Sequence, residues 1–252
     1  MTVVKEKQLI EVPKKDARSQ REVDSWLDVF SIFIHDIESP LATVKYLLKL
    51  IEEDKLDLSK PRHRKLVGSS RIAVERAENI LYDIMAVAKA GKAGIPVELV
   101  NLVPDTIIRE AISLAEGSAM ENDIEITYTN NAGNIIVKAD PKLLKRVLDN
   151  LIYNAVRHTP GGEKISVYTE PGEKSVFIHV KDSGPGLENI EPDKLFEKYG
   201  QINLRAQGKH RGVGLGLYFC KLAAIGMGGT IMADDHPNGG AVFSIKLNKV
   251  KG

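Results

Sequence analysis

A seven-residue repeat of apolar side chains constrains the fold of this chain more than any other feature. From residue 27 to residue 51, apolar positions alternate spacings of three and four: Leu27, Phe30, Ile34, Ile37, Leu41, Val44, Leu48 and Ile51. A mean period of 3.5 residues is typical of helices that pack along a shared seam. Beyond a polar run and Pro61, the same rhythm continues at Leu66, Ala73, Ala77, Ile80, Ile84 and Val87. The two stretches predict an antiparallel, all-α helical hairpin.

A hairpin with two such apolar seams needs a further surface to cover it. Pairing with a second copy into a dimeric four-helix bundle is the simplest solution, so the sequence predicts a homodimer. The alternative is that the hairpin packs on a second domain of its own chain.

The pattern changes near residue 95, and 252 residues are enough for two domains. Lys89–Gly94 contains the Gly and Ala residues of a hinge. We therefore predict a polar lead-in over residues 1–22, the hairpin over 23–94 and a second domain over 95–252.

The second domain mixes short strands with helices. Strand patterns fall at residues 97–100, 124–128, 135–137, 165–168, 176–181, 230–233 and 241–247, and helical patterns at 104–119, 141–157 and 213–225. This order lacks regular βαβ crossovers and predicts an α+β sandwich, with helices on one face of a mixed sheet.

Composition excludes several classes of function. The chain has 35 basic and 34 acidic side chains, so no uniform field would recruit nucleic acid. Cys220 is the single cysteine, which excludes an internal disulfide and a multi-thiolate metal site. Because no apolar run approaches 18 residues and no signal peptide is evident, we expect neither membrane contact from this chain nor export, and a reducing, cytoplasmic location.

His35 is the most informative residue of the hairpin. It lies one position off the apolar seam, with Asp36 beside it and Ser39 four positions on. An imidazole is a competent nucleophile toward phosphorus when a carboxylate removes its proton. Pro40 removes a main-chain hydrogen bond and should bend the helix there. An ordinary solvated surface histidine remains the alternative on these residues alone.

Three features of the second domain suggest a nucleotide site. A turn from Asp182 to Leu187 follows a strand, and its Asp could accept a hydrogen bond from an adenine amino group. Gly208, Gly212, Gly214 and Gly216 punctuate a loop that could cradle phosphates at a helix start, although it is neither a P-loop nor a dinucleotide fingerprint. Taken singly, an ordinary strand-ending loop explains the turn equally well.

A pair of asparagines forms the third feature. Asn150 and Asn154 are four apart on one helix, where their carbonyl oxygens could hold Mg²⁺, and Arg157 and His158 close that helix. Without context, capping or surface roles are the alternative for such a pair.

In chain order, these motifs resemble those of sensor histidine kinases. The matching residues are His35-Asp36-x-x-Ser39-Pro40, Asn150-x-x-x-Asn154, Asp182-x-Gly184-x-Gly186, Phe196 and Gly212-x-Gly214-x-Gly216. The nucleotide motifs are also similar to those of the wider superfamily of gyrase, mismatch-repair and heat-shock chaperone ATPases. The resemblance covers roughly residues 23–248.

The resemblance implies roles for individual residues. His35 would be the phospho-acceptor, Asp36 would assist its deprotonation, and Ser39 would act in dephosphorylating the partner. Asn154, helped by Asn150, would ligate Mg²⁺, and Asp182 would read the adenine of ATP. The residues implied to bind nucleotide are Asn150, Asn154, Arg157, His158, Asp182, Gly184, Gly186, Lys198, Gly212, Val213, Gly214, Leu215 and Gly216.

The resemblance further implies a mobile lid over Phe196–Arg211 and a response-regulator receiver domain as partner, whose aspartate accepts the phosphoryl group. Two positions depart from the family pattern. Ser39 stands where Thr or Asn is usual, which puts phosphatase strength in doubt, and Val213 replaces a small polar residue. Two other functions stay open: a nucleotide-controlled dimeric scaffold or phosphatase, and a chaperone-like or topoisomerase-like ATPase.

Overall fold

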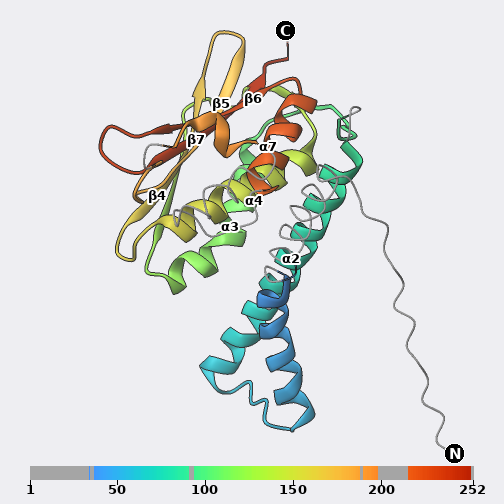
Figure 1. Ribbon diagram of the computed structural model, residues 1–252. Coiled ribbons are helices and arrows are strands. Elements are labelled where there is room, and N and C mark those ends of the chain that lie inside the picture. Colours follow the sequence, from blue (N-terminus) through green and yellow to red (C-terminus); the bar gives the residue numbers. More distant parts are fainter. Residues whose placement is uncertain (1–33, 35–36, 91–93, 188–189, 198–214, 251–252) are drawn as a thin grey trace, which may run out of the picture.

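The structure is a computed structural model that describes residues 34, 37–90, 94–187, 190–197 and 215–250. A helix over residues 37–52 and helix α2 (Pro61–Ala90) run antiparallel, as Figure 1 shows in blue and teal. The predicted helical hairpin is therefore present over residues 37–90, whereas its predicted start, apart from residue 34, lies outside the described residues. Lys89 and Ala90, which we assigned to the hinge, still belong to α2, and residues 91–93 lie outside the described part.

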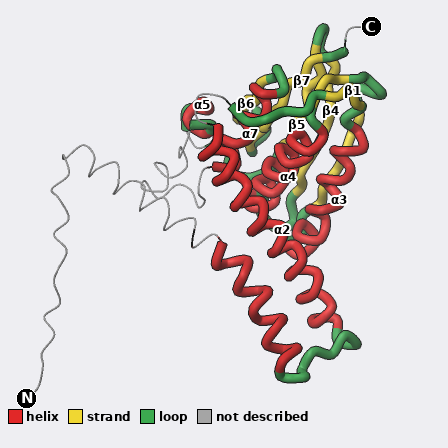
Figure 2. Tube along the Cα trace, turned by 90° about the vertical axis from the view of Figure 1, so that its right-hand side faces the viewer, coloured by secondary structure: helices red, strands yellow, loops and turns green. Residues whose placement is uncertain are grey.

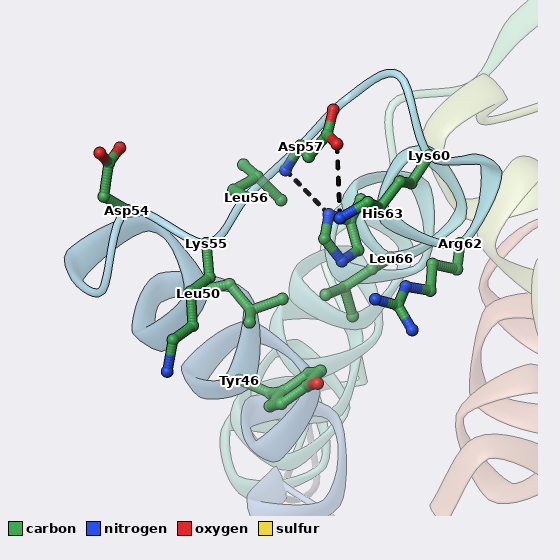
Figure 3. A pocket seen from close by; sticks show the side chains of 10 residues that line it. All are labelled: Tyr46, Leu50, Asp54, Lys55, Leu56, Asp57, Lys60, Arg62, His63 and Leu66. Atoms are coloured by element: carbon green, nitrogen blue, oxygen red, sulfur yellow. Dashed lines mark hydrogen bonds and ion pairs between the residues drawn. The ribbon is translucent and has the colours of Figure 1, made fainter.

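The hairpin connection is closed by hydrogen bonds around His63. This side chain is only 7% exposed, and its Nδ1 accepts a hydrogen bond from the main-chain N–H of Asp57 at 2.8 Å. Figure 3 shows that bond and the ion pair of Asp57 with Lys60 at 3.4 Å. Because His63 satisfies a main-chain donor of the connection, its role here is structural.

Five strands form the main sheet in the order β2-β4-β5-β7-β6. The β2–β4 pair is parallel and the other pairs are antiparallel, so the sheet is mixed, as expected. The strands are β2 (Glu125–Asn130), β4 (Lys164–Pro171), β5 (Ser175–Lys181), β6 (Thr230–Asp235) and β7 (Ala241–Asn248). Side chains alternate between the two faces of each strand.

Helices α3 (Asp105–Glu121), α4 (Pro141–His158) and α7 (Leu215–Gly226) cover one face of this sheet (Figure 1). The middle helix, α4, buries a stripe of side chains at helical spacing, and on the sheet Val176, Ile178 and Val180 of β5 meet it. The stripe consists of Leu143, Leu144, Val147, Leu148, Leu151, Ile152, Ala155 and Val156. The described part of the second domain is thus the predicted α+β sandwich.

A second, two-stranded sheet pairs β1 (Val100–Leu102) with β3 (Val137–Ala139). Both strands begin later than the sequence pattern indicated. Val97 lies outside β1 and packs against the core of the domain, and the N–H of Glu98 donates to the Asp140 side chain at 2.8 Å instead of to a neighbouring strand. The same carboxylate caps α4 through Lys142 and Leu143. A short helix, α5 (Pro192–Leu195), was not predicted.

Helix α2 also contacts the second domain, lying beside α7 (Figure 2). Lys65 pairs with Glu121 at the end of α3, at 3.4 Å, and the Arg146 guanidinium on α4 donates to the carbonyl oxygen of Asn79. The sequence left open that the hairpin packs on the second domain of its own chain. The structure shows such packing for one side of α2. None of the helices in the described ranges has the length and apolar character that crossing a bilayer requires.

Other apolar side chains of the hairpin stay exposed. Tyr46 is 56% exposed and Leu48 51%, both on the helix over 37–52, and Leu81 on α2 is 49% exposed. Ile34, Leu41, Ile51, Leu58, Val67, Val74 and Met85 are exposed as well. Ile34, Leu41 and Leu48 follow one another at seven-residue spacing, and apolar side chains that share one exposed face in this way are typical of protein interfaces. The dimeric bundle remains a prediction.

Candidate nucleotide site

Asp182 lies directly after β5 and is only 4% exposed. Its main-chain N–H donates to Ala241 at 3.0 Å, and its Oδ1 accepts from the N–H groups of Gly184 at 2.9 Å and Ala241 at 3.0 Å. The other carboxylate oxygen, Oδ2, receives none of the hydrogen bonds found among the described residues. The fold thus fixes this carboxylate by one oxygen and leaves the second as an acceptor.

Glycines allow the chain to approach closely around this carboxylate. A Cβ on Gly184 would lie 2.6 Å from the carbonyl oxygen of His158, and one on Gly240 would collide with the carbonyl oxygen of Asp182. Gly186 has a φ of 79°, in the left-handed region that favours glycine. Gly184 therefore joins the turn to the end of α4, while Gly186 sets the path of the turn.

A hollow opens beside Asp182 between α4, the turn and β7. Its wall is mainly apolar and contains a single carboxylate. It is lined by Asn154, His158, Asp182, Pro185, Gly186, Leu187, Leu195, Leu217, Ala241 and Phe243. The buried carboxylate in this wall could accept a hydrogen bond from an amino group on a flat ring. Adenine has such a group, whereas guanine presents a carbonyl oxygen at the equivalent edge.

The two asparagines of α4 differ in their surroundings. Asn154 lines the hollow, and Asn150 lies one turn earlier, against the start of α7. A Cβ on Gly216 would stand 3.3 Å from the Asn150 Oδ1, so this glycine lets α7 approach α4. The Asn150 Nδ2 is buried and makes no hydrogen bond within the described structure. A buried amide without a partner is unusual, and a ligand could satisfy it.

Other predicted site residues fall in different places. His158, in the last turn of α4, lines the hollow, whereas Arg157 beside it is exposed. Leu215 begins α7 and is buried. Ser39 is exposed on the helix over 37–52. The predicted residues that lie outside the described part are His35, Asp36, Lys198, Gly212, Val213 and Gly214.

The face of α4 near α2 carries charge. Asp149 pairs with Lys145 at 2.8 Å, and its side chain is 15% exposed. Burial raises the pKa of this carboxyl, partly offset by the Lys145 ammonium, and Glu75 on α2 adds to the rise. The Asp149 Oδ1 is buried without a hydrogen-bond partner in the described structure. Asp149 therefore carries its charge at a cost to folding.

The sequence did not single out most of the apolar wall. Leu195, Leu217 and Phe243 join the hollow from three separate elements. Their apolar character was visible, but their convergence depends on β7 pairing with β5, where Phe243 stands opposite Val180. Phe196, which the motif order contained, is buried and packs edge-on against Phe243, with ring centroids 6.4 Å apart.

Comparisons with known proteins identify the family of the second domain. Residues 139–251 match the model of the family described as histidine kinase-, DNA gyrase B-, and HSP90-like ATPases. Sporulation kinase A of Bacillus subtilis is 31% identical over 215 residues, which cover 85% of this chain and 33% of that protein. The chain spans from 14% to 62% of the length of the first curated relatives that it matches.

Solved structures share the fold. The catalytic domain of the histidine kinase ThkA superposes with a TM-score of 0.54 at 27% identity, covering 61% of this chain and 99% of that one. The histidine kinase ThkA in complex with the response regulator protein TrrA gives a TM-score of 0.58 at 23% identity, covering 92% of this chain and 65% of that one. The family match and the relatives show that residues 139–251 of this chain form an ATP-binding domain of the histidine kinase, gyrase and HSP90-like ATPase family.

Proposed function

We propose that this chain is the core of a two-component sensor histidine kinase, which phosphorylates His35 from Mg-ATP and passes the phosphoryl group to an aspartate of a response regulator. The observation that carries the proposal is the joint presence of the Asp182 hollow and, earlier in the chain, the His35-Asp36-x-x-Ser39-Pro40 sequence motif, of which Ser39 and Pro40 lie on the first helix of the hairpin. A gyrase-like or chaperone-like ATPase would account for the first feature and leave the second unexplained.

The base of ATP would enter the hollow with its amino group toward Asp182. Gly184 and Ala241 hold one oxygen of this carboxylate, so the other is fixed in direction before the nucleotide arrives. A fixed acceptor binds without first losing side-chain freedom. The apolar wall formed by Leu187, Leu217 and Phe243 would pack on the ring. Arg157 and His158 would contact the rest of the nucleotide at the end of α4.

Asn154, helped by Asn150, would hold Mg²⁺ through its amide oxygen, in keeping with the preference of this ion for oxygen ligands and retained waters. The ion supplies charge neutralisation at the phosphates. Among the described residues, no three His, Cys, Asp or Glu side chains group as metal ligands. The neutral asparagines suit a site that shares the ion with phosphate oxygens. Gly212, Gly214 and Gly216 would meet the phosphates through their main-chain amides.

The transfer itself forms a bond between an imidazole nitrogen of His35 and the γ-phosphorus and breaks the bond from that phosphorus to the β–γ bridging oxygen, so ADP leaves. Asp36 would take the imidazole proton. Positioning and charge neutralisation supply most of the rate enhancement in such reactions. The phosphoryl group would then pass from His35 to a carboxylate oxygen of the receiver domain, and His35 would be regenerated. Ser39 would act when that acyl phosphate is hydrolysed.

The exposed apolar positions of the hairpin support a homodimer. Tyr46, Leu48 and Leu81 are about half exposed in the single chain, and a second hairpin could cover them. The charge change Leu48→Glu should convert a dimer to a monomer in size-exclusion chromatography with light scattering. A monomeric unaltered chain would contradict the dimer.

Labelling with γ-³²P-ATP and Mg²⁺ tests the kinase activity. We expect label that is lost in acid and kept in alkali, as a phosphoramidate requires, and that is absent in His35→Gln. His63→Gln is the matched control: it lies in the same hairpin, and its amide oxygen can accept the Asp57 hydrogen bond in place of Nδ1. Label that persists in His35→Gln would refute the assignment of this residue.

A second candidate is a nucleotide-controlled dimeric scaffold or phosphatase. The packing of α2 beside α7 favours it, since nucleotide binding at one end of α7 could change how the hairpin is held. Tight ATP binding with no phosphohistidine, in a sample that still dephosphorylates a receiver domain, would support this second function over the first.

A further inference from the structure

One rung of the β6–β7 ladder holds both ends of the turn from Asp182 to Leu187. Asp235, the last residue of β6, stands opposite Ala241, the first residue of β7. Ala241 binds the start of the turn through the Asp182 carboxylate at 3.0 Å. Asp235 binds its end, where the Leu187 N–H donates to the Asp235 Oδ1 at 2.6 Å. The turn is thus attached at two points to neighbouring strand positions.

We propose that Asp235 is a positioning residue for base recognition, which holds Leu187 and Gly186 against the β6–β7 rung so that the turn forms the wall of the adenine hollow. The inference rests on the proposed function, because it assigns a task to a residue that does not itself line the hollow. Leu187 and Gly186 do line it, and Asp235 acts through them.

The contact is close as well as polar. A Cβ on Gly186 would lie 2.5 Å from the Asp235 Oδ1, so a larger residue there would displace this carboxylate from its present position. Gly186 also has the positive φ that aims the Leu187 N–H at the acceptor. A charged acceptor makes a stronger hydrogen bond than a neutral one. The carboxylate and the glycine therefore determine the path of the turn together.

The rung is itself fixed by a tight turn. The His236 N–H donates to Gly240 at 2.9 Å, and the Gly239 N–H donates back to His236 at 2.9 Å. Gly240 then touches the main chain at Asp182, where no side chain would fit. Movement of the β6–β7 hairpin would therefore carry the turn with it, which makes the hairpin part of the base site.

The test compares ADP and GDP binding by isothermal titration to the full chain and three variants. Asp235→Ala should weaken ADP binding about three- to tenfold, the net value of one ordinary hydrogen bond at an exposed position, and reduce the preference for ADP over GDP by a similar factor. Asp235→Asn keeps an oxygen acceptor, so it should retain most of the ADP affinity and most of the preference for ADP over GDP. Asp234→Ala removes the same charge from the preceding residue, which is exposed as Asp235 is but receives none of the side-chain hydrogen bonds found among the described residues, and it should change neither.

A change in the preference for ADP over GDP distinguishes a role in positioning the turn from a general loss of stability. Loss of folded protein would reduce the binding of ADP and of GDP by the same factor. Equal affinities and equal preference in Asp235→Ala and Asp234→Ala would overturn the inference. If Asp235→Ala fails to fold, hydrogen exchange of the Leu187 amide in the unaltered chain decides, because exchange at the unprotected rate contradicts the contact. If the unaltered chain binds neither nucleotide, the proposed function fails. The contact between Asp235 and the turn is then tested separately: the Leu187 amide should exchange faster in Asp235→Ala than in Asp234→Ala, and equal exchange in both variants would contradict it.

Discussion

The guanidinium of Arg146 on α4 donates a hydrogen bond to the main-chain carbonyl of Asn79 on α2, and it also lies over the ring of Phe219, 4.8 Å from the ring centroid. One side chain thus links the helical hairpin to two helices of the ATP-binding domain. An arginine in this position can join the two parts because its planar group hydrogen-bonds at its edge and stacks on its face.

Arg146→Ala should loosen this packing. Losing the hydrogen bond and the stacking should increase the fraction of molecules in which α2 has left the domain at least about fivefold. Small-angle X-ray scattering would then give a larger radius of gyration. Arg71→Ala, which removes an exposed arginine of α2, is the control and should leave the radius unchanged. The same radius in both variants would mean that Arg146 does not hold the two parts together.

Asp149 should make the stability of the domain depend on pH. Burial raises its pKa, so the folded chain binds a proton more readily than the unfolded chain does. Below the pKa of about 3.9 in the unfolded chain, Asp149 is protonated in both states and its burial costs no charge-related stability. As the pH rises from there through the raised pKa of the folded chain, the free energy of unfolding decreases. Asp149→Asn should therefore be at least as stable as the unaltered chain at pH 7, and its relative stability should fall as the pH falls.

Urea unfolding between pH 4 and pH 8 measures this difference. Asp234→Asn, at an exposed position, is the control and should give a difference that does not change with pH. Lys145 provides a second check, because its ammonium lowers the pKa of Asp149. Replacing it by methionine should move the pH-dependent window upward. A flat difference for Asp149→Asn would show that the carboxylate is not penalised by burial.

Much of the domain could be predicted because its periodic patterns are local. The alternation in β5 and the helical stripe of α4 each lie within one stretch of sequence, and both elements were found. The error at β1 has a specific cause: Val97 reads as a strand residue, but it packs on the core while Asp140 takes the N–H of Glu98. A carboxylate more than forty positions away is not visible in a local pattern.

The site was predicted only in part, for the same reason. Asp182 and Gly186 stand in one short motif, so the turn was identifiable. Asp235 was missed, because its contact with Leu187 depends on how β6 pairs with β7. The contact of α2 with α7 likewise follows from three-dimensional packing rather than from the repeat that predicted the hairpin.

Asp182→Asn separates the two roles of the buried carboxylate, which are to hold the turn through Gly184 and Ala241 and to accept a hydrogen bond from the base. The remaining amide oxygen can still accept from Gly184 and Ala241, so the turn should keep its shape. The other oxygen becomes an NH₂ donor that faces the amino group of adenine. ADP affinity should therefore fall at least about tenfold while thermal stability changes little. Asp182→Ala should lower both. Unchanged ADP binding in Asp182→Asn would remove this residue from base recognition.

Two adjacent glycines of the β6–β7 turn allow a matched test of close packing. Gly239 and Gly240 have φ values of 87° and 80°, so an alanine at either position incurs the cost of a left-handed backbone. Only at Gly240 would the added Cβ also meet the main chain of Asp182, since nothing lies within 4 Å at Gly239. Gly240→Ala should therefore lower the free energy of unfolding by about 1–3 kcal/mol more than Gly239→Ala. It should also weaken ADP binding, because the collision displaces Asp182. Chemical unfolding and ADP titration of both variants measure the two effects, and equal losses at the two positions would show that the hairpin does not press on the base site.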